Sequence, residues 1–263
     1  MLAVVKIFIN FAAGFMVLFF KKKIQKKKLM RKLFGLLLLL LAVSSCEEDT
    51  NMIIHTPQRI HLYPGEQKQI EAESSQKIQY SSLNDYYASV DENGLVTARY
   101  VGDTQVRLST SAVKEFIQVS VIPRYTLYVE PYYEFPSTRY AVEKMYGEPF
   151  KEEDNCLVYE TLDVEASKYF YFCFDDDDNL LASVATITEG NEEELGKFLA
   201  ERYVTVNQEE FIYRNTLEVT DETVEIRSFY SDKYGSRVVV YAPYGTDFDT
   251  FKTFAEPLKY CKK

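Results

Sequence analysis

The stretch YSSLNDYYASVDENGLVTARYVGDTQV, residues 80–106, carries the strongest signal of how this chain folds. It places an Asn93-Gly94 turn dipeptide between two short apolar segments. The wider region 53–123 keeps this pattern, with alternating apolar segments separated by turn signals such as Pro64-Gly65. About seven short strands in about 70 residues predict an all-β, immunoglobulin-like sandwich.

This region resembles the bacterial immunoglobulin-like domain of group 2. The shared positions are an aromatic residue before two serines, an aliphatic-aspartate pair, the turn dipeptide, a valine-threonine-alanine strand and a later glycine: Tyr80, Ser81, Ser82, Val90, Asp91, Asn93, Gly94, Val96, Thr97, Ala98 and Gly102. Tyr80 stands where the family most often has tryptophan, a mild change that still fills a core. The resemblance covers most of residues 53–123 and implies an extracytoplasmic spacer or adhesion module without catalytic residues.

Residues 124–263 predict a separate α+β domain. The expected elements are a helix capped by Ser137 and ended by Gly147, strands over 156–162, 168–174 and 180–187, a second helix from Asn191, strands over 211–215, 223–230 and 237–241, and a terminal helix over 247–259. Because the order helix, strand, strand, strand occurs twice, this pattern indicates a duplicated unit.

The doubled order resembles the fold of the β-lactamase-inhibitor protein and of small outer-membrane assembly lipoproteins. The features that carry this resemblance are the helix ending MYGEP at 145–149, the strand at Tyr159 and an acidic turn after an aromatic strand. The resemblance implies protein binding on an open sheet face and no chemistry. It transfers no individual binding residue.

The N-terminal segment LFGLLLLLLAVSSCEED, residues 33–49, indicates where the protein is located. Its apolar run of 11 residues is too short for a membrane-spanning helix and fits a secretory signal. Val43, Ser44, Ser45 and Cys46 resemble the lipobox of bacterial lipoproteins, which implies cleavage before Cys46 and a diacylglycerol on its sulfur. The resemblance makes 1–45 a signal peptide and 46–52 a tether. The alternative is a signal anchor with a chance cysteine.

Two further features of this segment leave alternatives open. Translation that begins at Met30 gives a complete signal, whereas a start at residue 1 adds a long basic leader. Glu47, Glu48 and Asp49 resemble the export tag of surface lipoproteins, and the alternative is an ordinary solvated tether. We therefore expect an outer-membrane lipoprotein, and the tag favours exposure on the cell surface.

The charge of the mature chain excludes one class of partner. Residues 46–263 carry 21 of the 30 basic residues and all 40 acidic ones, a net charge of −19. Such a surface repels nucleic acid, so we expect no nucleic-acid partner. The expected partners are the membrane, through the N-terminal lipid, and an unknown protein or glycan.

The sequence offers no strong metal or catalytic motif. His55 and His61 are the only histidines, and no third ligand follows at a fixed spacing. The acidic run 175–179 lacks the glycine and glutamate of an EF-hand loop, because Leu180 and Thr186 occupy those places. We expect a solvated hairpin turn there, with a weak calcium site as the alternative. No catalytic residue, metal or cofactor is predicted, and an enzyme is not expected.

Three cysteines follow Cys46, and two of them are candidates for a disulfide bond. A hairpin that turns near residues 164–165 places Cys156 opposite Cys173, within reach of a cross-strand disulfide. The alternative is a pair of buried free thiols. Cys261 would then be unpaired.

The aromatic strand 169–174 suggests where a ligand binds. Its phenylalanines share one face and Tyr169, Tyr171 and Cys173 share the other. The helices should cover the phenylalanine face, because phenylalanine has no polar atom to satisfy. The hypothesis is an open tyrosine face, with Tyr159, Tyr169 and Tyr171 binding protein or glycan. The alternative is that these tyrosines fill a sheet edge or pack on the first domain.

Two classes of function follow from these observations. The first is a lipid-anchored binding protein, in which the immunoglobulin-like domain is a spacer that presents a C-terminal binding domain. The second is a periplasmic structural or assembly accessory of the outer membrane. Protease treatment of whole cells separates them, because only a protein on the exterior would be cleaved.

Overall fold

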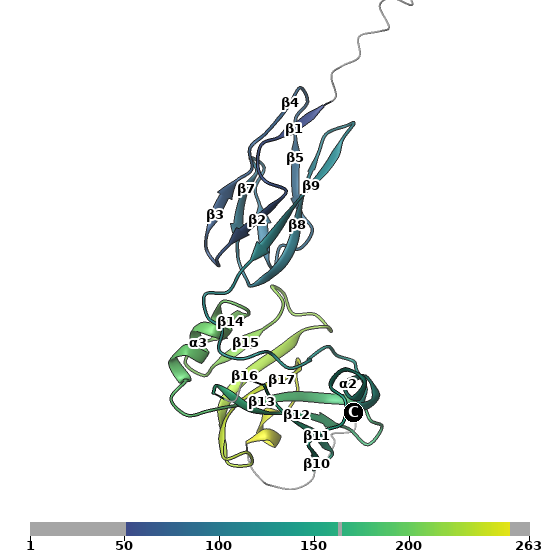
Figure 1. Ribbon diagram of the computed structural model, residues 1–263, viewed down its shortest axis with the longest axis vertical. Coiled ribbons are helices and arrows are strands. Elements are labelled where there is room, and N and C mark those ends of the chain that lie inside the picture. Colours follow the sequence, from purple (N-terminus) through teal and green to yellow (C-terminus); the bar gives the residue numbers. More distant parts are fainter. Residues whose placement is uncertain (1–50, 163–164, 253–263) are drawn as a thin grey trace, which may run out of the picture. The chain divides into compact units, whose positions relative to one another are not determined.

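The computed structural model describes residues 51–162 and 165–252, and most of their regular secondary structure is β-strand (Figure 1). The proposed signal peptide, Met30, Cys46 and Cys261 lie outside these described residues. The strands fall into two groups with separate sheets and core clusters: we call β1 to β9 the first domain and the elements from α2 onward the second.

The first domain is a sandwich of two sheets with a short extra pair. One sheet has the order β2-β9-β8-β5, the other β3-β7-β6, and β1 pairs with β4. The strands are β1 Met52–Ile54, β2 Arg59–Leu62, β3 Gln67–Gln69, β4 Ala72–Ser74, β5 Gln79–Ser82, β6 Ala88–Val90, β7 Leu95–Ala98, β8 Gly102–Ser109 and β9 Lys114–Val121. Alternating side chains of both sheets, such as Leu62, Val96 and Val119, form one apolar core, as the alternation predicted.

The Asn93-Gly94 dipeptide forms the turn between β6 and β7. The Asp91 carboxylate accepts hydrogen bonds from the backbone N–H groups of Asn93 and Leu95 at 2.9 and 2.8 Å. Gly94 has φ of +83°, and a Cβ atom there would lie 2.9 Å from the Tyr80 ring. The position therefore requires glycine both for its backbone conformation and because Tyr80 packs against it.

The second domain contains one eight-stranded antiparallel sheet with the order β10-β11-β12-β13-β17-β16-β15-β14. Its elements are α2 Arg139–Tyr146, β10 Lys151–Glu153, β11 Cys156–Glu160, β12 Ser167–Phe174, β13 Leu180–Ile187, α3 Glu192–Ala200, β14 Val204–Asn207, β15 Ile212–Arg214, β16 Val224–Ser231, β17 Ser236–Pro243 and the 3₁₀ helix η1 Phe248–Phe251. Each α-helix is followed by four strands, one more than the sequence predicted.

The ends of the helices differ in detail from the prediction. Thr138, and not Ser137, is the N-cap of α2, and its side chain accepts a hydrogen bond from the backbone N–H of Ala141. Gly147 follows α2 with φ of +81°, as a helix-ending glycine does. The predicted terminal helix is described only as η1, in which Phe248 and Phe251 are buried as expected.

Both α-helices pack on the same face of the sheet. Val142 of α2 and Leu195, Phe198 and Leu199 of α3 belong to one core cluster, together with the phenylalanines of β12, Phe170, Phe172 and Phe174. The prediction that the helices cover the phenylalanine face is therefore confirmed. The segment before α2 joins this core through Leu127 and Tyr128, so it covers part of the same face.

The opposite face of the sheet is also covered, and the prediction that it is open was wrong. Tyr171 and Cys173 lie in a second core cluster with Phe248 and Phe251 of η1. Tyr234, in the β16–β17 connection, packs on Tyr171 with 4.6 Å between the ring centroids. The chain thus folds back over the tyrosine face after β17, which removes that face from water.

Candidate functional site

The three tyrosines of the binding hypothesis do not form one exposed face. Tyr171 is only 7% exposed, because η1 and Tyr234 cover it. Tyr169 is half-exposed, and its ring lies 6.1 Å from that of the exposed Phe150. Burial also raises the pKa of Tyr171, so its hydroxyl is neutral at physiological pH. The prediction that Tyr171 lies at the centre of an open binding surface is therefore wrong.

Tyr159 lies on the other face of the sheet. It pairs with Phe170 across β11 and β12, so the two side chains point to the same, helix-covered side. Tyr159 is 6% exposed, and its hydroxyl donates a hydrogen bond to the backbone oxygen of Gly147 at 3.0 Å. Placing Tyr159 with Tyr169 and Tyr171 was wrong, because the register that pairs Cys156 with Cys173 also pairs Tyr159 with Phe170, on the phenylalanine face.

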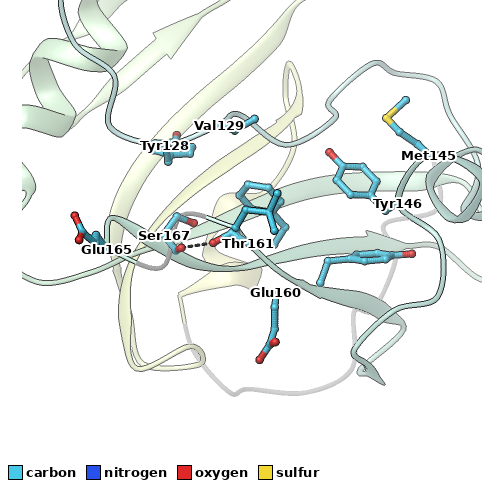
Figure 2. Close-up of a pocket in the computed structure, with 11 residues that line it drawn as sticks. Tyr128, Val129, Met145, Tyr146, Glu160, Thr161, Glu165 and Ser167 are labelled. Atoms are coloured by element: carbon cyan, nitrogen blue, oxygen red, sulfur yellow. Dashed lines mark hydrogen bonds between the residues drawn. The ribbon is translucent and has the colours of Figure 1, made fainter.

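Tyr159 instead lines the candidate site, a cavity of about 720 Å³ beside α2. Figure 2 shows the side chains around it. They come from the segment before α2, the end of α2, strand β11 with the residues after it, and the start of β12: Tyr128, Val129, Met145, Tyr146, Tyr159, Glu160, Thr161, Leu162, Glu165, Ser167 and Phe170. We call this the α2 cavity.

The rings of Tyr146 and Tyr159 form one wall of the α2 cavity. Their centroids are 5.2 Å apart, and Tyr146 lies 4.8 Å from the buried Phe172. The Tyr146 hydroxyl accepts a hydrogen bond from the backbone N–H of Tyr132 at 2.9 Å. Because packing and hydrogen bonds hold both rings, this wall is formed before any ligand arrives.

Both tyrosines of this wall stay protonated. Burial raises the pKa of Tyr159, and the negative charge of Glu143 raises it further. Burial also raises the pKa of Tyr146, although the hydrogen bond from Tyr132 partly lowers it. The wall is therefore uncharged at physiological pH and presents apolar ring surface to a ligand.

Three apolar side chains at the cavity are exposed to water. Val129 is 75% exposed and Met145 is 59% exposed, and Leu162 is fully exposed. Single exposed apolar residues are ordinary, but three that line one concavity form a patch of the kind that marks an interaction site. A ligand in the α2 cavity would remove this apolar surface from water.

The cavity also contains a polar group without a partner. Ser167 is fully buried, and its hydroxyl has no hydrogen-bond partner among the described residues. Its backbone oxygen accepts a hydrogen bond from the Thr161 hydroxyl, drawn as the dashed line in Figure 2. A buried hydroxyl without a partner costs free energy, and this one has no surface that a ligand in the cavity can reach.

The charges at the cavity are all negative. Glu160 and Glu165 are exposed, and neither carboxylate forms an ion pair in the described part of the chain. No lysine, arginine or histidine is among the lining residues. Glu160 pairs with Tyr169 across β11 and β12, so its side chain points to the opposite face of the sheet, and the site is an apolar concavity with Glu165 at its edge.

Cys156 and Cys173 lie behind this site, on the opposite face of the sheet. They face each other across β11 and β12, the register expected from the sequence, and form a disulfide with a sequence separation of 17 residues. The bond ties β11 to β12. Both strands also supply side chains to the α2 cavity.

The histidines and the acidic turn are separate from the cavity. His55 lies 3.4 Å from Glu73 and is exposed, as is His61. Within residues 51–162 and 165–252, no group of three or more His, Cys, Asp or Glu side chains is placed to hold a metal ion. The weak calcium site, the alternative to a solvated turn, therefore gains no support from the geometry of these residues.

The acidic turn 175–179 is organised by its own hydrogen bonds. The Asp175 carboxylate accepts from the backbone N–H groups of Asp177 and Asn179 at 2.9 and 2.8 Å. Burial alone would raise the pKa of Asp175, but the hydrogen bonds from Asn179 and Asp177 lower it. Arg139 pairs with Asp178 at 2.7 Å. These contacts are those of a hairpin turn with a solvated acidic tip.

A smaller concavity of about 390 Å³ lies at the ends of β15 and β16. Arg237 and Glu210 both line it, and Arg237 lies over the ring of Phe211 at 5.2 Å. Its charges are mixed, whereas those of the α2 cavity have one sign.

The sequence identified only part of the candidate site. Tyr159 was named, but Met145, Tyr146 and Ser167 were not assigned to a site. The motif MYGEP at 145–149 could have indicated Met145 and Tyr146, because it places these two apolar residues at the end of a helix, directly before the glycine that ends it. The role of Ser167 had no sequence signal, since only the fold shows that its hydroxyl is buried without a partner.

Comparisons with solved structures give distant similarities. The chain is similar to domains 4–9 of the surface layer protein SbsC, with 9% identity, a TM-score of 0.26, and coverage of 75% of this chain and 27% of that one. For domains 1–6 of SbsC the identity is 10%, the TM-score 0.22, and the coverage 73% and 22%. For human protocadherin-24 EC1-2 the identity is 12%, the TM-score 0.22, and the coverage 72% and 91%.

At these identities and TM-scores the likeness carries no argument about function. The chain spans about a quarter of the length of the first two SbsC structures. No curated protein matches the chain. In the described ranges, neither α-helix has the length and hydropathy needed to cross a bilayer. Residues 62–115 match the model of the bacterial Ig-like domain (group 2), which confirms the resemblance predicted for this part of the chain.

Proposed function

We propose that this chain is a lipid-anchored binding protein displayed on a bacterial cell surface. The bacterial Ig-like domain is the spacer, and the second domain binds a protein partner through the α2 cavity. The match over residues 62–115 supports the spacer, because such a domain suits an extracytoplasmic location. The lipobox-like residues that end at Cys46 support the anchor. The proposed role is binding, without catalysis.

The α2 cavity is the observation that carries the binding role. It combines a preformed tyrosine wall with the exposed apolar side chains of Val129, Met145 and Leu162. A concave apolar surface with a few polar groups is the usual form of a binding site. A protein partner fits it, because a polypeptide carries both apolar side chains and backbone groups that form hydrogen bonds.

The architecture of the second domain supports a related proposal, that it arose from a duplicated unit. Each helix precedes four strands, and the sheet order β10-β11-β12-β13-β17-β16-β15-β14 reads the same from both edges inward. Such a symmetric order is what two copies of one unit would give, and it supports the resemblance to the β-lactamase-inhibitor fold. Binding would then use the helix-covered side of the sheet, since η1 covers the other side.

The second candidate is a periplasmic accessory of outer-membrane assembly. The α2 cavity would be the binding site in this function as well, because an assembly accessory also binds a partner protein. The two functions differ in location. The acidic residues after Cys46 favour the cell surface, since they resemble an export tag.

Protease treatment of intact cells tests the location. If the protein is on the surface, an added protease removes the second domain from whole cells while a periplasmic control protein survives. Survival of the second domain in intact cells, with cleavage after the outer membrane is opened, would show that the accessory function is correct.

Site-specific crosslinking in living cells tests the cavity. A photoreactive benzoylphenylalanine in place of Leu162 should crosslink to one discrete protein. The same probe in place of the exposed Tyr140 of α2, which does not line the cavity, is the matched control. Met145→Glu should abolish the crosslink from position 162. A crosslink that persists in Met145→Glu, or that forms equally from position 140, would contradict the proposal.

A further inference from the structure

We propose that the smaller concavity at the ends of β15 and β16 is a second binding site, which takes one neutral sugar residue of a glycan. Its volume of about 390 Å³ falls at the lower end of the range for small-molecule sites, roughly 300–1,000 Å³. We call it the edge pocket. It shares no lining residue with the α2 cavity, so the proposal goes beyond the protein-binding role and does not depend on it.

The edge pocket lies where β15 stops covering the edge of β16. The last pair between the two strands joins Ile212 to Arg227, and one further hydrogen bond runs from the backbone N–H of Ser228 to the backbone oxygen of Phe211 at 3.1 Å. Beyond Ser228, β15 forms no further pair with β16. Side chains from both faces of β16 therefore line the pocket, and Tyr230 lines it from the helix-covered side.

One arginine and two aromatic rings carry the proposal. Tyr230 and Arg237 lie opposite each other on β16 and β17, so their side chains are neighbours on the same face of the sheet. The Arg237 guanidinium lies over the ring of Phe211, 5.2 Å from its centroid. Tyr230 is 56% exposed, so much of its ring is open to a ligand. The C–H groups of a sugar ring can pack on Tyr230 while its hydroxyls reach Arg237.

Phe211 is held in an unusual backbone conformation beside this arginine. Its φ is +53°, a left-handed value that a bulky aromatic residue rarely adopts. Its ring lies against Gly196 of α3, where a Cβ atom would be 3.4 Å from it. Residues held in such conformations concentrate at ligand sites, because the surrounding structure maintains the strain. The ring under Arg237 is therefore in place before a ligand arrives, which lowers the entropy cost of binding.

The charges at the edge pocket favour a neutral ligand. Within residues 51–162 and 165–252, Arg237 forms no ion pair, and neither do Glu209 and Glu210 of the pocket lining. Two further cations of the lining, Arg227 and Lys252, are engaged in ion pairs. An anionic ligand would meet the two glutamates, and a cationic ligand would meet the arginines and the lysine.

A sugar residue suits this set of groups better than other neutral ligands. Each sugar hydroxyl both donates and accepts, so it can accept from Arg237 and donate to the carboxylates of Glu209 and Glu210. An apolar ligand would cover these charged groups without replacing their hydrogen bonds to water. A peptide residue carries one backbone donor and one acceptor, fewer than the three charged side chains can engage. A sugar presents several hydroxyls around a single ring.

Saturation-transfer NMR on the full chain, in a detergent without sugar groups, tests the site. The probes are the neutral methyl glycosides of glucose, galactose, mannose and N-acetylglucosamine. The comparison ligands are the methyl glycosides of glucuronic acid, which is anionic, and of glucosamine, which is cationic, with N-acetylalanine methylamide as a neutral peptide. We expect at least one neutral glycoside to bind in the millimolar range and to bind more tightly than all three comparison ligands.

Variants assign the binding to the edge pocket. Tyr230→Ala should weaken the glycoside about three- to tenfold, whereas Tyr230→Phe, which keeps the ring, should bind it nearly as the parent does. Tyr244→Ala is the matched control, because Tyr244 is 57% exposed and does not line the pocket. Arg237→Gln should weaken binding by at least about tenfold, since it removes hydrogen bonds from a charged donor.

Three results would overturn the proposal. They are the failure of every neutral glycoside to bind, tighter binding of a charged glycoside or of the peptide, and an equal loss of affinity in Tyr230→Ala and Tyr244→Ala. Met145→Glu, in the α2 cavity, should leave the affinity for the glycoside unchanged. Failure of the glycan site would therefore leave the protein-binding role of the α2 cavity to its own crosslinking test.

Discussion

Tyr159 and Phe170 lie directly opposite each other on strands β11 and β12, and both line the α2 cavity. Their pairing places Tyr159 on the helix-covered side of the sheet, with its hydroxyl bound to Gly147 at the end of α2. One residue thus connects the sheet, the helix end and the candidate site.

The first prediction separates the ring of Tyr159 from its hydroxyl. Tyr159→Phe removes one hydrogen bond to the exposed Gly147, whose oxygen water can then reach. The free energy of unfolding should fall by about 0.5–1.5 kcal/mol. Tyr159→Ala removes a buried ring and should cost about 3–5 kcal/mol. Urea denaturation measures both. Tyr140→Phe, at an exposed position, should change stability by less than about 0.5 kcal/mol.

The second prediction concerns the disulfide. The Cys156–Cys173 bond closes a loop with a sequence separation of 17 residues. Removing it by Cys156→Ala with Cys173→Ala should lower the free energy of unfolding by about 2–4 kcal/mol, chiefly because the unfolded chain gains freedom. A Cys261→Ser background prevents thiol exchange. Reductant should destabilise the parent and leave the double variant unchanged, and an equal response of both proteins would contradict the assignment.

The third prediction uses two glycines of the first domain. Gly94 and Gly65 have nearly the same φ, +83° and +85°, but a Cβ at Gly94 would meet the Tyr80 ring whereas Gly65 has open space. Gly65→Ala should cost about 1–2 kcal/mol for its left-handed backbone. Gly94→Ala should cost a further 1–3 kcal/mol, roughly, from overpacking. Thermal unfolding measures the difference in stability between the two variants. An equal loss of stability in both would show that the Tyr80 ring moves aside without cost.

The fourth prediction concerns the pH dependence contributed by Glu130. Burial raises the pKa of this carboxyl above its usual 4.5, although the hydrogen bond from Tyr203 and the charge of Arg202 oppose the increase. The folded protein therefore holds this proton more tightly than the unfolded chain does. Its contribution to stability is full below the unfolded pKa and declines as the pH rises through the folded pKa.

Comparison with Glu130→Gln isolates this effect, because glutamine does not titrate. The stability of the parent relative to Glu130→Gln should fall as the pH rises from about 4 towards neutrality. Urea denaturation at several pH values checks it. A parent that becomes relatively more stable over this range would show that Arg202 and Tyr203 outweigh burial.

The sequence by itself determined the local features of this protein. Alternation and the Asn93-Gly94 turn predicted the sandwich, because a turn dipeptide and a period of two need only neighbouring residues. The pairing of Cys156 with Cys173 followed from hairpin register for the same reason. The phenylalanine face of β12 was also predictable, since a side chain without polar atoms favours the covered side.

Only the tertiary structure decided which surfaces stay open. Tyr171 is buried because η1 and Tyr234, more than 60 residues later in the chain, fold over it. The α2 cavity joins Tyr128, Tyr159 and Ser167 from separate segments. No local sequence pattern encodes these long-range contacts, because the burial of a side chain depends on which distant segments pack against it. The candidate site was therefore visible only after the chain was folded.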